Sequence, residues 1–300
     1  MELRHLRFFV AVAEEGSLST AAEKRLHTAQ PSLSRQMSDL EDEVGAKLMT
    51  RSVRGIVLTP SGKAFLDHAR LALAQVEAAT AAARRADQSA KASFALGFLT
   101  GQEMNWLPEA MRILRNDLPG IDVTVSSDNS PALADGLMRG KLDLAFMRRE
   151  EGAELEYRQI TREPLVVVLP SDHRLASCDS IEISAIASEP FIGMSKTAPV
   201  LQKVIDEYLQ HEGVELKPAH NIDNLAMAMS LVASTRSVTL LPAYTTNFLP
   251  WSLVSRPLAG EGTFIDLVVG YSKANRSSVL ELFLTHIDEL IARVSQRHAV

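Results

Sequence analysis

Residues 21–51 combine two short amphipathic segments with a tight break between them, and this arrangement constrains the fold more than any other part of the chain. In the second segment, apolar residues recur at steps of four, three and four, so they share one face of a helix with 3.6 residues per turn. We expect that face to be buried. Its residues are Leu33, Met37, Leu40 and Val44.

Both ends of this helix are marked in the sequence. Pro31 suits the first turn, where its missing N–H is not needed, and Gly45 suits the end, because glycine adopts a left-handed conformation without steric cost. The polar residues left at the exposed first turns are Gln30, Ser32, Ser34, Arg35 and Gln36. Gln and Arg can bond to purine edges in the major groove of DNA, while Ser and backbone N–H groups hold phosphates. An ordinary soluble helix with a polar face is the alternative.

The neighbouring segments favour the DNA-reading interpretation. A first helix is predicted by Leu3, Leu6, Val10 and Ala13, and Ser17 is a suitable N-cap for a second helix that carries Leu18, Ala21, Ala22 and Leu26. Residues 48–51 and 56–59 predict a short hairpin that turns at residues 52–55. This hairpin would present Arg51 and Arg54 as a wing beside the reading helix, although both arginines could instead only face solvent.

In the order and density of its motifs, the segment 1–62 resembles the winged helix-turn-helix domain of LysR-type transcriptional regulators. Two departures are Ala29, where the family often has Ser or Thr, and Met49, where it usually has Phe. The resemblance implies that double-stranded promoter DNA is bound by Gln30, Pro31, Ser32, Ser34, Arg35, Arg51 and Arg54. The motifs that carry it are Leu6-x-x-Phe9, Gly16-Ser17-Leu18-x-x-Ala21-Ala22, Gln30-Pro31-Ser32-Leu33-Ser34-Arg35-Gln36, Leu40-Glu41, Gly45-x-x-Leu48, Arg51 and Leu58-Thr59-x-x-Gly62.

Length, charge and cysteine content set further limits. A chain of 300 residues predicts two or three domains, and a net charge of −6 argues against indiscriminate coating of nucleic acid. The first 63 residues hold nine Lys or Arg against eight Asp or Glu, whereas the remainder holds 22 against 29. Cys178 is alone, so we expect no intrachain disulfide and no cysteine-based zinc site. With no signal peptide and no apolar run near the roughly 20 residues of a membrane span, we expect a cytoplasmic protein without a membrane partner.

A long helix is predicted from Thr59, its cap, and Pro60, in its first turn, to about Gln88, and it makes residues 63–90 a linker and dimerisation helix. Its small apolar residues alternate at steps of four and three, which is typical of a coiled-coil seam. We therefore expect homodimers through this linker helix, because paired heads fit a two-fold symmetric operator. A linker that lies on its own chain is the alternative. The seam residues are Phe65, Ala69, Ala72, Val76, Ala79 and Ala83.

After residue 90, apolar strands alternate with helical stretches, so the fold class is α/β. Strands are expected at 95–99, 121–125, 142–147, 165–169, 191–193, 238–241 and 267–271, and helices at 105–116, 131–139, 200–212, 225–234 and 279–294. The resemblance implies that residues 91–300 form a two-lobed effector domain similar to periplasmic binding proteins. Lobe I would span about 91–162 and 266–300, and lobe II about 163–265, with crossings near Arg162-Glu163 and Ile265-Asp266.

Ligands of open α/β sheets lie beyond the C-terminal ends of strands, where helix N-termini offer free N–H groups. Hydroxyl groups, a glycine and one lysine at such places suit a small organic or aromatic acid as the inducer. Arg236 replaces part of a Gly-rich turn common in the family, and it could line the cleft or only face water. The expected effector residues are Thr100, Gly101, Gln102, Ser130, Met147, Arg148, Ser195, Lys196, Thr197, Asn224 and Arg236.

The sequence contains none of the common catalytic motifs. The chain has no GxSxG, no phosphate-binding loop ending in GK[ST], no HExxH and no Rossmann glycine trio, and its eight histidines are scattered. We therefore expect no enzyme, no metal and no cofactor other than the inducer. A small-molecule carrier without regulatory DNA binding is the main alternative, and a hydrolase or transferase is a weaker one. The resemblance also implies homotetramers through the effector domains and a contact with RNA polymerase.

Overall fold

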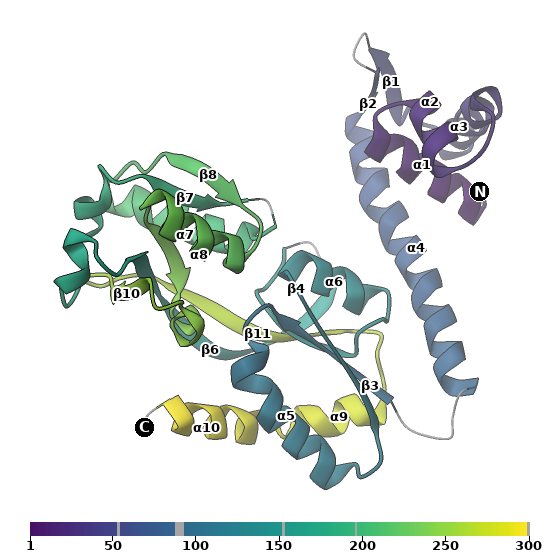
Figure 1. Ribbon diagram of the computed structural model, residues 1–300. Helices are drawn as coiled ribbons and strands as arrows, with labels where there is room; N and C mark the ends of the chain where they lie inside the picture. Colours follow the sequence, from purple (N-terminus) through teal and green to yellow (C-terminus); the bar gives the residue numbers. More distant parts are fainter. Residues whose placement is uncertain (53–54, 88–92, 152–153, 196, 299–300) are drawn as a thin grey trace. The chain divides into compact units, whose positions relative to one another are not determined.

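The computed structural model describes residues 1–52, 55–87, 93–151, 154–195 and 197–298 (Figure 1). The chain divides into two compact units, Met1–Arg84 and Arg85–Val300, which are described separately. None of the helices in the described part of the chain is both long enough and apolar enough to cross a bilayer.

The N-terminal unit is a three-helix head followed by a hairpin and a long helix. Its helical elements are α1 (Leu3–Glu15), α2 (Leu18–Thr20), the π-helical turn η1 (Ala21–Arg25), α3 (Gln30–Val44) and α4 (Pro60–Asp87), and its strands are β1 (Met49–Ser52) and β2 (Gly55–Leu58). The second predicted helix is therefore one α-turn that continues as a π-turn. The Ser17 hydroxyl accepts a hydrogen bond from the N–H of Thr20, as expected of an N-cap.

The core of the head confirms most of the predicted apolar face of α3. Leu33, Met37 and Leu40 are buried, but Val44 is 36% exposed, so the prediction that it shares the buried face was wrong. The helix ends there, because Gly45 takes the left-handed conformation (φ 73°), and the final residue has no neighbouring element to cover it.

The first turns of α4 belong to the same core. The ring of Phe65 lies edge-to-face against Phe9 with 5.1 Å between centroids, and Ala69 is buried beside it. These two residues of the predicted coiled-coil seam therefore contact the head of their own chain. Farther along α4, Ala72, Ala79 and Ala83 are exposed.

The C-terminal unit contains a seven-stranded sheet and a smaller two-stranded one. In the larger sheet the order is β10-β6-β11-β5-β3-β4, and β9 pairs with the far part of β6; β7 and β8 pair in parallel. The strands are β3 (Ser93–Leu99), β4 (Asp122–Asp128), β5 (Leu144–Met147), β6 (Leu155–Pro170), β7 (Phe191–Met194), β8 (Pro218–Ile222), β9 (Thr239–Pro242), β10 (Leu253–Pro257) and β11 (Phe264–Ser272).

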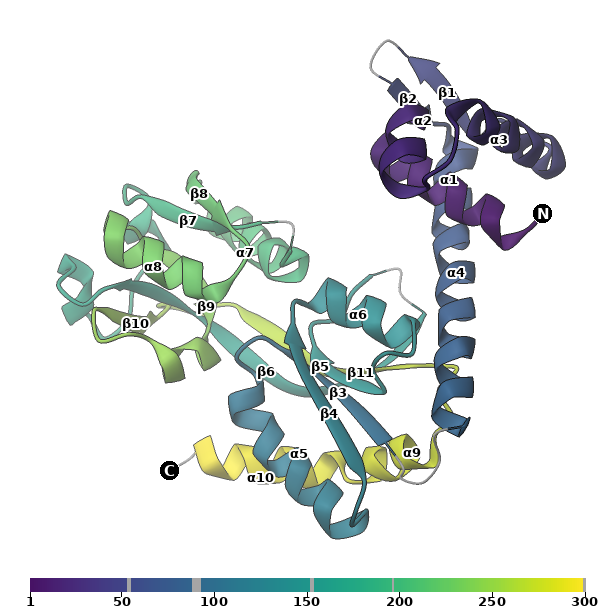
Figure 2. The same ribbon diagram turned by 45° about the vertical axis from the view of Figure 1, so that its right-hand side comes forward.

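Three hydrophobic clusters fill this unit, one on each face of the sheet in lobe I and one in lobe II. In lobe I, α5 (Glu103–Asp117), α9 (Ser278–Thr285) and α10 (Ile287–His298) cover one face of the sheet, and α6 (Ser130–Met138) covers the other (Figure 2). In lobe II, α7 (Pro199–Glu212) and α8 (Leu225–Thr235) pack on β7, β9 and the second half of β6, with short 3-10 turns at Arg174–Ser177, Ile183–Ile186 and Ala243–Phe248.

The strands β6 and β11 run from one lobe into the other. Ile160 and Leu267 belong to the core of lobe I, whereas Leu165 and Ile265 belong to that of lobe II. Glu163 pairs with Ile265 in the register of the two strands, so both crossings lie side by side. The predicted helix 279–294 is broken at His286 into α9 and α10, and the sequence did not predict β8 or β10.

Candidate functional site

The exposed end of α3 is the first candidate site. Ala29 provides no side-chain cap, and the helix ladder begins with the bond from the Leu33 N–H to the Ala29 carbonyl (3.1 Å), which leaves the preceding N–H groups for an outside partner. Arg35 is exposed, and no carboxylate of the described residues pairs with it. A phosphate or a base edge could therefore bind here without displacing an internal contact.

The structure brings five of the seven predicted DNA-binding residues to this end of α3. Pro31, Ser32 and Arg35 are exposed, whereas Gln30 and Ser34 are half-buried. The Ser32 hydroxyl accepts a hydrogen bond from Gln36 Nε2 (3.4 Å), and Gln36 Oε1 is buried without a partner among the described residues. For Arg51 only the backbone, in β1, is described, and Arg54 lies outside the described residues.

Glu41 ties the hairpin to the reading helix. Its buried carboxylate accepts hydrogen bonds from the N–H groups of Leu48 (2.9 Å) and Met49 (3.1 Å) and from Lys47 Nζ (2.7 Å). Burial alone would raise the pKa of Glu41, but the hydrogen bonds from Lys47, Met49 and Leu48 outweigh it and hold the pKa below its usual value. In the sequence, Glu41 was only one of the motif residues shared with the family, and its role in holding the hairpin against α3 was not predicted.

Gly62 fixes the other side of the hairpin. A Cβ atom at this position would lie 1.8 Å from the carbonyl oxygen of Leu48, which already accepts a hydrogen bond from the Thr59 N–H (3.0 Å). The backbone of α4 can therefore approach the hairpin only through a glycine. Glu41 and Gly62 together set the position of the wing relative to α3.

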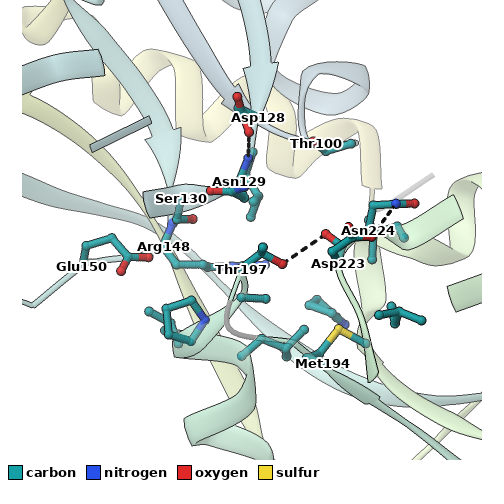
Figure 3. Close-up of a pocket in the computed structure, with 18 of the residues that line it drawn as sticks. Thr100, Asp128, Asn129, Ser130, Arg148, Glu150, Met194, Thr197, Asp223 and Asn224 are labelled. Atoms are coloured by element: carbon teal, nitrogen blue, oxygen red, sulfur yellow. Dashed lines mark hydrogen bonds between the residues drawn. The ribbon is translucent and has the colours of Figure 1, made fainter. Parts of the chain in front are cut away.

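A pocket between the two lobes of the C-terminal unit is the second candidate site (Figure 3). It encloses about 830 Å³ of empty space, part of which is open to solvent. Lobe I contributes the ends of β3, β4 and β5 with the residues that follow them, and lobe II contributes the start of α7, the start of α8 and the turn after β9. Figure 3 shows Asn129 and Ser130 facing Thr197 and Met194 across this space.

The pocket contains some of the predicted effector residues but not others. Thr100, Ser130, Arg148, Thr197 and Asn224 line it. Lys196 lies outside the described residues. The predicted residues that do not line it are Gly101, Gln102, Met147, Ser195 and Arg236.

Four of these residues are held elsewhere by contacts that the structure shows. Met147 is fully buried in the core beneath α6, and the exposed Arg236 pairs with Asp172 (2.9 Å). Gly101 packs against aromatic rings, since an added Cβ would lie 2.9 Å from Tyr244 and from Phe248. Ser195 Oγ lies 2.8 Å from Thr197 Oγ1, so its hydroxyl is engaged by a residue that does line the pocket.

A buried polar network fixes the floor of the pocket. Arg148 donates to Glu163 Oε2 (2.6 Å) and to the carbonyl of Asp266 (2.9 Å). Gln102 Nε2 donates to the other oxygen of Glu163 (2.9 Å), and Gln102 Oε1 accepts a hydrogen bond from Trp106 Nε1 (3.1 Å). Glu163 therefore neutralises the guanidinium of Arg148, and Gln102 supports the site from beneath.

The start of α7 faces the same pocket and offers free donors. Ala198 gives no side-chain cap, Pro199 has no N–H, and the ladder begins only with the bond from Gln202 N to the Ala198 carbonyl (3.0 Å). Val200 and Leu201 line the pocket at the positive end of this 14-residue helix, and their N–H groups have no hydrogen-bond acceptor among the described residues. By contrast, Asn129 and Asn224 already cap α6 and α8 with bonds of 3.0 and 2.9 Å.

Several lining residues were missed by sequence reasoning. Tyr244 donates to the Thr100 carbonyl across the lobes (3.0 Å), and burial raises the pKa of its phenol. Glu150 lines the pocket, and one of its carboxylate oxygens is buried without a hydrogen-bond partner among the described residues. Burial, with help from Glu151, raises the pKa of the Glu150 carboxyl. The sequence predicted that β4 ends at residue 125, whereas it ends at Asp128. Because ligands were expected beyond the C-terminal ends of strands, the correct end would have pointed to Asp128 and Asn129.

In the described ranges, no group of three or more His, Cys, Asp or Glu residues could hold a metal ion. Among the described residues, no histidine or carboxylate that would activate a nucleophile is hydrogen-bonded to the hydroxyl groups of Thr100, Ser130 and Thr197.

Known proteins match both units. The family described as bacterial regulatory helix-turn-helix protein, lysR family, matches residues 3–63, and the LysR substrate binding domain matches residues 87–292. The Hca operon transcriptional activator HcaR of Escherichia coli (strain K12) is 35% identical over 300 residues, covering 98% of this chain and all of the relative. The regulator CatR of Pseudomonas putida is 31% identical over 289 residues, covering 96% and 98%.

Solved structures agree over nearly the whole chain. Full-length BenM has a TM-score of 0.59 and 25% identity, covering 98% of this chain and 97% of that one. Full-length CbnR in complex with its target DNA has a TM-score of 0.56, with coverage of 97% and 100%; at 23% identity it supports the fold alone.

Proposed function

The chain belongs to the LysR family of bacterial transcriptional regulators, and on this premise we propose which residues read DNA, which class of molecule controls the protein, and how copies of it assemble. The family binds promoter DNA and effectors and forms oligomers, and its members are regulators rather than enzymes. A DNA-binding regulator acts where the chromosome is, so we place the protein in the cytoplasm.

DNA is read by the first turns of α3. Arg35 and Gln30 contact base edges, and the N–H groups left free by Ala29, with the hydroxyls of Ser32 and Ser34 and the ring of Pro31, meet the backbone. The wing residues Arg51 and Arg54 contact the adjacent phosphates. The observation that carries this proposal is the exposed, acid-free start of α3 beside a hairpin held in place by Glu41.

Retardation of the DNA upstream of the protein's own gene tests this directly. We expect Arg35→Ala to weaken specific retardation about 10- to 100-fold while weak binding to unrelated DNA remains. Arg276→Ala, which removes an exposed arginine of the C-terminal unit, is the matched control and should bind normally. Equal retardation by both variants would place the reading surface elsewhere.

The effector is a small organic acid bound between the lobes. Its carboxylate lies against the N–H groups at the start of α7 and the hydroxyls of Thr100 and Ser130, all of which belong to residues that line the pocket. An aromatic or aliphatic body fits the apolar lining, which includes Leu99, Val200, Leu201, Ile222 and Pro242. Lys196, beside Thr197 in the sequence, would add a positive charge.

The unpartnered oxygen of Glu150 narrows the class of acid. A buried acceptor without a donor costs roughly 1–3 kcal/mol, and this cost is recovered when a ligand supplies the donor. The effector therefore carries a hydroxyl or amino group in addition to its carboxylate. The two groups are separated, because Glu150 would repel the carboxylate.

Dimers form through α4 and tetramers through the C-terminal units. The small exposed residues Ala72, Ala79 and Ala83 allow two helices to approach closely. On the C-terminal unit, Val125 on the edge strand β4 is 45% exposed, and Met227 on the uncharged helix α8 is 48% exposed. Sedimentation should show tetramers that become dimers in Val125→Asp/Met227→Asp; tetramers in that variant would exclude these surfaces.

Effector binding alters transcription by shifting the arrangement of the lobes and, through α4, the spacing of the paired heads. A ligand can do this only if it binds one arrangement more tightly than the other. Because the pocket takes side chains from both lobes, its occupancy differs between a closed and an open arrangement. Altered contact with RNA polymerase is the expected output.

A further inference from the structure

A second groove lies where β6 and β11 cross between the lobes and meet the first turns of α7. It has about 740 Å³ of empty space, including its open side. Val200 lines both this groove and the effector pocket, so the start of α7 separates the two spaces. We call this space the hinge groove, because its walls come from both crossing strands and from a helix of lobe II.

Two arginines face the hinge groove without an acidic partner. Among the described residues, no carboxylate lies within 4.0 Å of the guanidinium of Arg149 or Arg162, and neither guanidinium donates a hydrogen bond to a described residue. Most other arginines of this unit are committed to carboxylates. These are Arg112, Arg139, Arg148, Arg158, Arg174, Arg236 and Arg293.

Aromatic rings hold both guanidinium groups in position. Arg162 lies over the ring of Phe264, 4.8 Å from its centroid, and Arg149 lies over Tyr157 at 5.6 Å. A guanidinium that stacks on a ring keeps the N–H groups at its edge available for a bidentate carboxylate. The side chains therefore lose little conformational freedom when an anion binds.

The rest of the groove is largely apolar. Val200 and Val204 of α7 form one wall, and Phe264, which is 41% exposed, extends the apolar surface at the mouth. The lining contains one carboxylate, that of Asp266, which accepts a hydrogen bond from Gln159 Nε2 (2.9 Å). The groove thus combines an excess of positive charge with an apolar wall.

We propose that the hinge groove is a second ligand site, which binds a small carboxylate with an apolar body. The carboxylate bridges Arg149 and Arg162, and the body lies against Val200 and Val204. Because the arginines belong to lobe I and the hinge and the valines to lobe II, occupancy favours one arrangement of the lobes. The contact of Arg148 with the Asp266 carbonyl and the shared wall of Val200 connect this site to the effector pocket.

Binding of 4-bromobenzoate to the full-length protein tests the proposal, because bromine locates the probe by anomalous scattering in crystals. We expect a bromine position in the hinge groove of the wild type and none there in Arg149→Gln/Arg162→Gln. Calorimetry should show one site fewer per chain in this variant, or at least a tenfold weaker affinity for one site. Arg276→Gln serves as the control for loss of a surface charge and should keep the site.

Several outcomes would overturn the proposal. The first two are the absence of bromine from the wild-type groove at saturating probe and unchanged probe binding by the double variant. The third is competition by inorganic phosphate that is as tight as binding of the probe, because the apolar wall would then contribute nothing to affinity. Specific DNA retardation is measured in parallel. Where the double variant retains specific retardation and a bromine position in the effector pocket, a failure to find the probe in the hinge groove counts against that groove alone and leaves the proposed regulator function intact.

Discussion

The two candidate sites are assembled in different ways. The DNA-reading surface uses the first turns of one helix, α3, fixed by a hairpin a few residues later, whereas the effector pocket collects side chains from Leu99 to Tyr244. The first site therefore depends on a few local contacts, and the loss of any one of them should lower the stability of the head. The second depends on the relative position of two lobes, so single substitutions in it should change ligand preference more than stability.

The largest expected effect is in the head. Gly62→Ala would place a Cβ atom 1.8 Å from the Leu48 carbonyl, so we expect the head to lose more than about 4 kcal/mol or not to fold. Calorimetry should show the N-terminal transition lost and the C-terminal one unchanged, which would sharpen the contrast between the units. Ser61→Ala, at the exposed neighbouring position, is the control. A normal head transition in the glycine variant would refute the close approach.

Glu41→Ala should cost the head about 2–3 kcal/mol, because two backbone N–H groups lose a charged acceptor. The pKa of Glu41 is lowered in the folded head, so its contribution is present above the usual value of 4.5 and is lost as pH falls through the lower, folded value. The difference between wild type and variant should consequently shrink below pH 4.5. Asp42→Ala, an exposed neighbour, should behave like wild type; a pH-independent difference would argue against the ionised contact.

Arg35→Ala should weaken specific binding about 10- to 100-fold, or roughly 1–3 kcal/mol, without changing the melting of either unit. The guanidinium has no ion pair in the described part of the chain, so its removal leaves no internal group unsatisfied. Quantitative retardation together with calorimetry separates binding from folding. A loss of head stability equal to the loss of binding would show that Arg35 is structural.

The smallest effect is expected in the effector pocket. We predict that 3-hydroxybenzoate or 3-aminobenzoate stabilises the C-terminal unit more than benzoate does, and that Glu150→Met reduces this preference roughly fivefold, or about 1 kcal/mol. Thermal shift of the full chain measures it. Glu151→Met is the matched control, since Glu151 is exposed and pairs with Lys203. An unchanged preference in Glu150→Met would contradict the proposed hydrogen bond from the effector's hydroxyl or amino group to Glu150. No stabilisation by any of the acids would count against an organic acid as the effector.

The contrast between the two sites also explains what sequence alone could predict. The start and end of α3 follow from Pro31 and Gly45, and its buried face from spacing, because these signals act within one helix. Val44, Phe65 and Ala69 were misjudged because periodicity shows that a face is apolar but not which element covers it. Phe65 turned out to pack on Phe9 of its own head.

In the C-terminal unit, sequence predicted most strands and the general position of the pocket but not its chemistry. Tyr244 and Glu150 lie far apart in the chain, and their roles arise only when the lobes meet. Arg236 was expected at the pocket but does not line it, because its side chain pairs with the exposed Asp172. The break at His286 was also missed, because the apolar spacing continues across it and only packing decides where α9 ends.

The most direct test of the central claim is a footprint of the full-length protein on the DNA upstream of its own gene, with and without an acid that stabilises the C-terminal unit. We predict a specific protected region in both states, with a change in the spacing or extent of protection when the acid is bound. No specific protection, or identical footprints with and without a bound acid, would contradict the link between α3 and the effector pocket.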